Sequence, residues 1–135
     1  KHAGNYCVTV SIENVEFLQP VEVGDLVSFY ASVNYVGKSS LVVGMKVVAE
    51  NVKMGTARHT NSSYFTMVAK GDDNKTAIVP ELVLEEEIEV RRFLEALKRK
   101  EFSAAFRDRM QDVKSAFSRK DMDLLSEERC VVGFI

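Results

Sequence analysis

The sequence predicts an α+β protein with an antiparallel sheet within residues 1–80 and a C-terminal helical extension over residues 81–135. Up to Pro80, long segments with an apolar residue at every second position are joined by short connections, which is typical of antiparallel strands. Beyond Pro80 the apolar residues recur every three or four positions, which is typical of an amphipathic helix. We therefore expect a sheet region, residues 1–80, followed by a helical region, residues 81–135.

The sequence predicts five strands, and the first three of them show alternating apolar residues. They lie at residues 8–12, 26–35, 39 or 40 to 50, 58–70 and 76–79. In the first of them Val8, Val10 and Ile12 alternate with hydroxyl residues, as in a half-buried strand. The third strand also carries the apolar residues Val42 and Val48 on its second face. A second covered surface is therefore expected on that face.

The apolar face of such a sheet has to be covered by another layer of structure. No segment of residues 1–80 has the apolar spacing of a helix that could cover it. Either a second sheet packs on this face, or a covering helix lies upstream and residues 1–3 form its last turn. The apolar pattern alone leaves both alternatives open.

The helical region carries two apolar stripes. Three glutamates at residues 85–87 place negative charge where the dipole of a helix N-terminus favours it. The first stripe covers residues 90–97 and the second residues 102–117, and they differ by well over a quarter turn at about 100° per residue. Either a straight helix faces two different partners, or it breaks near residues 100–103, and we expect a break or bend there. We also expect an added strand or an apolar clip at residues 130–135.

Length and composition fit a soluble domain with one core, since 135 residues are 46% hydrophobic and 28% charged. A net charge of -2 gives no field that would attract nucleic acid or an anionic membrane. The apolar runs are too short to span a bilayer, and no targeting segment is visible at Lys1, although one could have been removed. Cys7 and Cys130 match no metal or disulfide spacing and predict two free thiols in a reducing compartment.

The residues that could perform chemistry show no catalytic arrangement. His2 and His59 have no carboxylate partner that the sequence can assign, and His2 is expected to end a helix. Cys7 precedes a strand without a recognisable base, so a structural thiol is expected. Asp72 and Asp73 are expected to be solvated on a turn. No metal site and no serine-nucleophile motif is present.

Five short motifs occur in order along the chain: KHAG at residues 1–4, CVTVSI at 7–12, FLQPVEVGD at 17–25, GKSS at 37–40 and RHTNSSYFTMVA at 58–69. Together they resemble the acyl-CoA hydrolase family, a branch of the hotdog-fold thioesterases. The resemblance continues to about residue 99, which is roughly three quarters of the chain. It implies a hotdog fold, in which an antiparallel sheet wraps a central helix, and it favours an upstream covering helix.

The resemblance implies that the catalytic groups of this family lie on the central helix and on the loop before it. In the family a carboxylate activates water or attacks the thioester, and a helix N-terminus with an amide polarises the carbonyl. These positions would lie upstream of Lys1, so no catalytic residue is named in this chain. No cofactor is required, and coenzyme A is bound as part of the substrate or product.

The resemblance also implies a coenzyme A groove at the GKSS hairpin. Ser39, Ser40 and Leu41, next to Lys38, would line the groove. On the residues alone, this hairpin is equally a turn whose hydroxyls bond local backbone groups.

Two further groups of residues would complete this groove. Val10, Ser11 and Ile12 would lie beside the pantetheine arm, and Arg99 with Lys98 would reach the nucleotide phosphates. A basic side chain can bind these phosphates because its charge-assisted hydrogen bonds neutralise their negative charge. On the residues alone, the basic run at 98–100 is equally a solvated helix face.

The expected function is hydrolysis of fatty acyl-CoA to free fatty acid and coenzyme A. Two alternatives stay open: a non-catalytic acyl-CoA-binding half of a two-hotdog protein, and a hotdog hydratase or dehydratase. The expected assembly is a homo-oligomer of paired hotdogs, three such dimers making a hexamer. No nucleic acid or membrane partner is expected, and the cytosol and the mitochondrial matrix both fit.

Overall fold

The computed structural model describes residues 1–134, without the side chain of Asn14. The chain forms two compact units, residues 1–97 and residues 98 onward, which are described separately. The predicted division at residue 80, between a hotdog domain and an extension, stays a prediction about the domain arrangement.

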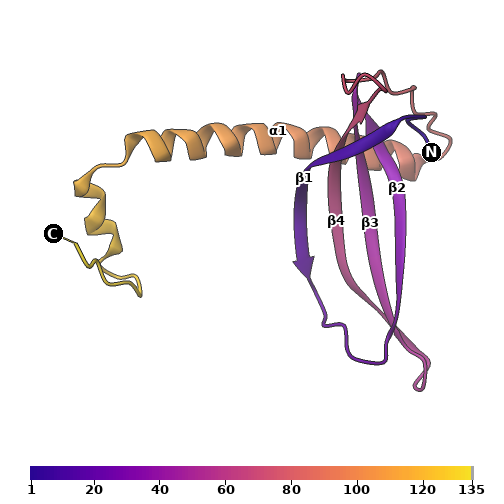
Figure 1. Cartoon of the computed structure of the whole chain (residues 1–135). Helices are drawn as coiled ribbons and strands as arrows, with labels where there is room; N and C mark the ends of the chain where they lie inside the picture. The colour runs from indigo at the N-terminus through magenta and orange to yellow at the C-terminus, as the bar shows by residue number, and fades with distance from the viewer. Residues whose placement is uncertain (135) are drawn as a thin grey trace. The chain divides into compact units, whose positions relative to one another are not determined.

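The first unit is built on four antiparallel strands: β1 Tyr6–Phe17, β2 Leu26–Val36, β3 Ser40–Asn51 and β4 Thr56–Lys70. They form one sheet in the order β1-β4-β3-β2, so the first strand lies beside the last (Figure 1). The predicted antiparallel sheet is confirmed.

The prediction of a fifth strand at residues 76–79 was wrong. Only Thr76 forms a bridge, with Lys70. The N–H of Ala77 then bonds the carbonyl of Ala69 at 2.9 Å, whereas the N–H of Val79 bonds the carbonyl of Lys38 at 2.9 Å. Because its hydrogen bonds go to two different segments, this stretch does not continue along one partner strand.

The sheet has two faces, which β3 defines. Its apolar face carries the odd-numbered residues from Leu41 to Val47, and its polar face carries the even-numbered residues from Ser40 to Lys46. In the pairing of β3 with β4, Leu41 lies opposite Met67, so apolar residues of the two strands share a face.

The core occupies one end of the apolar face. Ala3, Leu41, Ala69 and Val79 are buried there and pack together. The rest of this face is open: Phe29 is 64% exposed. Within residues 1–80 the structure contains no helix, as expected, and the covering helix stays a prediction.

Residues 1–4 form a single turn closed by a hydrogen bond from the N–H of Gly4 to the carbonyl of Lys1, at 3.1 Å. Gly4 has φ of +64°, the left-handed conformation in which helical turns commonly end. Ala3 is carried by this turn into the core, where it is 5% exposed. The turn therefore fixes the start of the chain against the sheet.

The helix α1, Glu87–Ala116, begins where the glutamate run predicted. Its N-terminal turn is capped by Glu89, whose carboxylate accepts the N–H groups of Glu85 and Glu86 at 2.7 and 3.1 Å. In the first unit, Phe93 packs on Tyr35 of β2, with ring centres 4.9 Å apart.

The predicted break near residues 100–103 was wrong, because α1 is continuous across them. These residues include neither Pro nor Gly, and Lys98 pairs with Glu101 at 2.9 Å across one turn. A shift in the position of the apolar stripe therefore does not require a helix to break.

The second unit ends in the 3₁₀ helix η1, Arg119–Leu125. Residues 130–134 form no strand; Val132 and Phe134 line a cavity of about 210 Å³ together with Met122. The strand alternative is therefore wrong, and the apolar clip stays a prediction, since Val131 and Phe134 are 96% and 62% exposed. The predicted role of Ile135 lies outside the described residues.

We expect the Gly44→Ala variant to lose about 1–3 kcal/mol of unfolding free energy, as in other overpacked sites. A Cβ on residue 44 would overlap the Asn34 amide nitrogen and would lie 3.2 Å from its Cγ. Urea unfolding measures the loss. Gly133→Ala is the control, since a Cβ on residue 133 would have no atom within 4 Å.

A double-mutant cycle identifies the cause of this loss. In the Asn34→Ala background the Gly44→Ala change should cost little, because the overlapping amide is gone. Equal costs in the two backgrounds would contradict the proposed overlap.

Candidate functional site

The hairpin at residues 37–40 is held by three backbone hydrogen bonds. Within it, the N–H of Gly37 donates to the carbonyl of Ser40 at 2.8 Å. The carbonyl of Ser39 accepts the N–H of Ala69 at 2.9 Å, and that of Lys38 accepts the N–H of Val79. The hairpin is therefore fixed to β4 and to the segment after it.

The Ser40 hydroxyl lies close above Gly37. A Cβ on residue 37 would lie 2.8 Å from Ser40 Oγ and 3.4 Å from Tyr35 Oη. The glycine thus leaves space for two hydroxyl groups at the start of β3. Ser39 and Ser40 are half-buried and Lys38 is exposed, whereas Leu41 is 5% exposed and packs in the core.

Val10, Ser11 and Ile12 lie on β1, on the other side of β4 from this hairpin. Val10 is the irregular residue between Thr9 and Ser11, and it is 56% exposed, while Ile12 is 54% exposed. Two strand spacings separate β1 from β3, about 10 Å. The fold therefore places the two predicted segments on either side of one strand.

Lys98 and Arg99 belong to the second unit. Lys98 is two-thirds exposed and forms its ion pair with Glu101, as on a solvated helix face. Arg99 is half-buried. Their part in coenzyme A binding stays a prediction.

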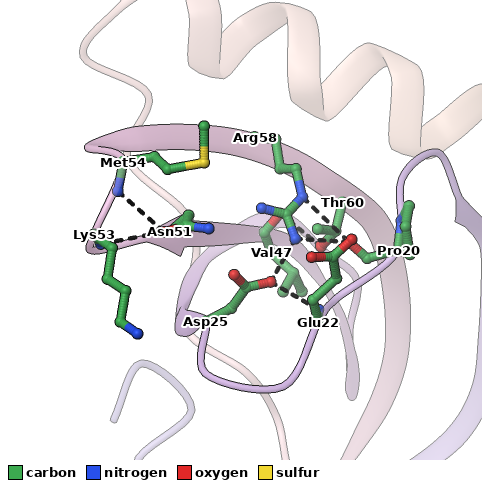
Figure 2. A network of polar contacts seen from close by, with 9 residues as sticks. All are labelled: Pro20, Glu22, Asp25, Val47, Asn51, Lys53, Met54, Arg58 and Thr60. Atoms are coloured by element: carbon green, nitrogen blue, oxygen red, sulfur yellow. Dashed lines mark hydrogen bonds and ion pairs between the residues drawn. The ribbon is translucent and has the colours of Figure 1, made fainter.

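An ion pair between Asp25 and Arg58 lies apart from this site and fixes the turn before β2 to β4. Figure 2 shows the Arg58 guanidinium also donating to the Pro20 carbonyl, at 3.2 Å from Nε and 3.1 Å from Nη2. The Glu22 N–H donates to the Asp25 carboxylate at 2.7 Å. This hydrogen bond and the Arg58 charge lower the pKa of Asp25, and partial burial opposes them.

Asp25 should contribute stability that is lost in acid. Its folded pKa lies below its ordinary value of about 3.9, so the contribution is present above that pH and disappears as the pH falls through the folded pKa. We expect Asp25→Asn to lower the unfolding temperature at neutral pH and to differ less from the unchanged protein in acid.

Thermal unfolding between about pH 3 and about pH 7 tests this dependence. Asp72→Asn, on an exposed turn, is the matched control and should change neither the midpoint nor its pH dependence. A pH-independent difference for Asp25→Asn would instead indicate that the charge of Asp25 is unimportant.

The two histidines bond neutral groups rather than carboxylates. His2 Nε2 lies 3.0 Å from the Pro80 carbonyl oxygen. His59 Nε2 lies 3.0 Å from the Asn61 carbonyl oxygen and 2.9 Å from Ser62 Oγ. Both arrangements are structural.

Among residues 1–134, no group of three potential metal ligands comes together and no helix could span a membrane.

A pocket on the polar face of the sheet contains Asn34, Lys46 and Arg92. The sequence motifs did not indicate this pocket. One signal in the sequence could have indicated it: Gly44 interrupts an otherwise apolar strand, and such a glycine often marks a close approach.

Comparison with known proteins identifies the family. Residues 1–56 match the thioesterase superfamily. An acyl-CoA hydrolase from Staphylococcus aureus, solved with butyryl coenzyme A, coenzyme A and coenzyme A disulfide, superposes with a TM-score of 0.73 at 32% identity, covering 85% of this chain and 70% of that one. The chain belongs to the acyl-CoA hydrolase family of hotdog thioesterases. The predicted family and fold are therefore confirmed.

Two further relatives complete the comparison. Protein VdlD of Helicobacter pylori is 47% identical over 100 residues, 71% of this chain and 57% of VdlD. A hexameric acyl-CoA thioesterase superposes with a TM-score of 0.71 at 35% identity, covering 75% of this chain and 65% of that one. The chain thus spans only about 57% of the length of VdlD.

Proposed function

We propose that the complete protein hydrolyses fatty acyl-CoA thioesters to free fatty acid and coenzyme A. The observation that carries this proposal is the 32% identity to the S. aureus acyl-CoA hydrolase over 70% of that enzyme. Release of free thiol from palmitoyl-CoA by the complete protein is the direct test. A complete protein that binds acyl-CoA without releasing thiol would be the non-catalytic alternative.

The hairpin of Ser39 and Ser40 suits the polar part of coenzyme A. Its half-buried hydroxyl groups can bond pantetheine amides, and its backbone is fixed by β4. Exposed Val10 and Ile12 offer apolar contact along the same ligand. Lys98 and Arg99 would supply the positive charge that the nucleotide phosphates require.

We expect Arg99→Ala to weaken coenzyme A binding by about 1–3 kcal/mol, because a charge-assisted hydrogen bond is lost. Calorimetric titration of the complete protein at low salt measures the change. Arg109→Ala, on the same helix and exposed, is the control and should bind normally. Equal affinities for Arg99→Ala and the control would assign Arg99 to a purely structural role.

The proposed assembly is a hexamer made of three hotdog dimers. The hexameric state of the thioesterase that superposes at 35% identity supports it. So does the open edge of β1, since an unpaired edge strand invites pairing with another chain. A monomeric mass by light scattering at micromolar concentration would contradict this assembly.

A further inference from the structure

A pocket of about 330 Å³ opens on the polar face of the sheet, within the first unit. Its floor comes from β2, β3 and β4, and residues of the first turns of α1 complete its wall. None of the residues assigned to coenzyme A in the proposed function lines this pocket. Its volume falls in the range of small-molecule sites, about 300–1,000 Å³.

Asn34 is the buried polar group of this pocket, at 6% exposed. Its Oδ1 accepts a hydrogen bond from Ser32 Oγ at 2.8 Å. Its Nδ2 lies over Gly44, whose missing side chain leaves it room. An amide N–H group that lines a pocket can donate to an acceptor oxygen of a bound ligand.

The pocket also has an excess of positive charge. Lys46, Arg91 and Arg92 line it, against the single carboxylate of Glu95. Arg91 pairs with Glu95 at 3.6 Å, and within the described part of the chain neither Lys46 nor Arg92 forms an ion pair. Two cations therefore remain for a ligand.

Two hydroxyl residues also line the pocket. Ser32 uses its hydroxyl proton in the hydrogen bond to Asn34 Oδ1, and Ser62 Oγ lies 2.9 Å from His59 Nε2. Amide, ammonium and guanidinium donors around a concave site, with an excess of positive charge, are the groups that bind phosphate oxygens. A neutral or cationic ligand would leave Lys46 and Arg92 uncompensated.

We propose that this pocket binds a phosphate group. The phosphate could belong to coenzyme A itself, a source that rests on the proposed function. Ser40 lies on the same polar face as Gly44, four residues away along β3, or about 13 Å. Alternatively it belongs to a separate phosphate-bearing small molecule.

Calorimetric titration of the complete protein with pyrophosphate at low ionic strength tests the site. We expect saturable binding that the double variant Lys46→Ala/Arg92→Ala weakens about tenfold or more, because two charge-assisted contacts are lost. The matched control is Lys114→Ala/Arg107→Ala, which removes two exposed cations of α1 outside the pocket and should bind normally. Unchanged unfolding midpoints exclude misfolding.

A kinetic measurement separates the two sources of phosphate. If the phosphate is that of coenzyme A, the pocket variant should raise KM for palmitoyl-CoA and leave kcat unchanged. If it belongs to another molecule, KM should stay the same while pyrophosphate binding is still lost. A complete protein that lacks hydrolysis would refute the proposed function without affecting the titration.

Two results would overturn the phosphate site. One is the absence of saturable pyrophosphate binding at low ionic strength. The other is an equal loss of affinity in the pocket variant and in the control variant, which would show that binding follows overall charge. In either case the Asn34 amide would hydrogen-bond with water rather than with a phosphate.

Discussion

Hydrolysis of palmitoyl-CoA by the 135-residue chain alone is expected to be at least about a hundredfold slower than by the complete protein, since a positioned acid or base contributes about 10²–10⁴. The family resemblance places the carboxylate or amide that acts on the thioester before Lys1. Three titratable residues of this chain are engaged in other contacts. His2 and His59 bond backbone or hydroxyl groups, and Asp25 is held by Arg58.

Thiol release at equal molar concentrations measures this difference. A circular dichroism spectrum with β-sheet character is needed for the shorter chain, so that unfolding is not mistaken for missing chemistry. The complete protein carrying His59→Ala is the matched control and should keep its kcat. Equal rates for the two chains would contradict the prediction and return attention to His2, His59 and Asp72.

Alternation of apolar residues was sufficient to predict the second and third strands nearly in full, whereas for β1 it covered only residues 8–12 of Tyr6–Phe17. Leu41 to Val47 alternate in the sequence as they do in the sheet, but the irregularity at Val10 interrupts the alternation predicted for Val8 to Ile12. The segment at residues 76–79 has too few residues for periodicity to distinguish a strand from an extended connection. Whether this segment forms a strand depends on its hydrogen-bond partners, which are distant in the sequence.

The polar contacts of the sheet could not be predicted in the same way. Asp25 and Arg58 are separated by 33 positions, and neither has a local signal for the other. Alternation with Ser32 already places Asn34 on the polar face, whereas the irregularity of β2 between Val33 and Tyr35 brings Tyr35 opposite Val42 of the same face. A single irregularity of this kind changes which side chains share a face from that point on, and periodicity cannot reveal it.

The coenzyme A residues were suggested by family resemblance rather than by any pattern in the residues themselves. The structure brings Ser39 and Ser40 to a rigid hairpin and places Val10 to Ile12 across β4. Leu41, by contrast, is buried in the core. A motif thus identifies a segment, whereas the direction of each side chain depends on the register of the sheet.

The largest effect on stability is expected from Phe29→Ala in the complete protein, a loss of about 3–5 kcal/mol, which is the cost of truncating a buried Phe. Phe29 is 64% exposed on the apolar face of the first unit, beside the half-buried residues Val27, Val43 and Met45. Such a face is expected to be covered by a further helix, supplied by the remaining sequence or by another chain. Urea unfolding of the complete protein measures the loss.

The control for this prediction is Val23→Ala, since Val23 is fully exposed on the turn before β2 and should change the unfolding free energy by less than about 0.5 kcal/mol. A small effect for both variants would mean that the apolar face stays open to water in the complete protein. A large effect for Phe29→Ala alone would place a packed layer over it. Because this layer would carry the catalytic groups in the hotdog arrangement, the substitution should also reduce thiol release from palmitoyl-CoA.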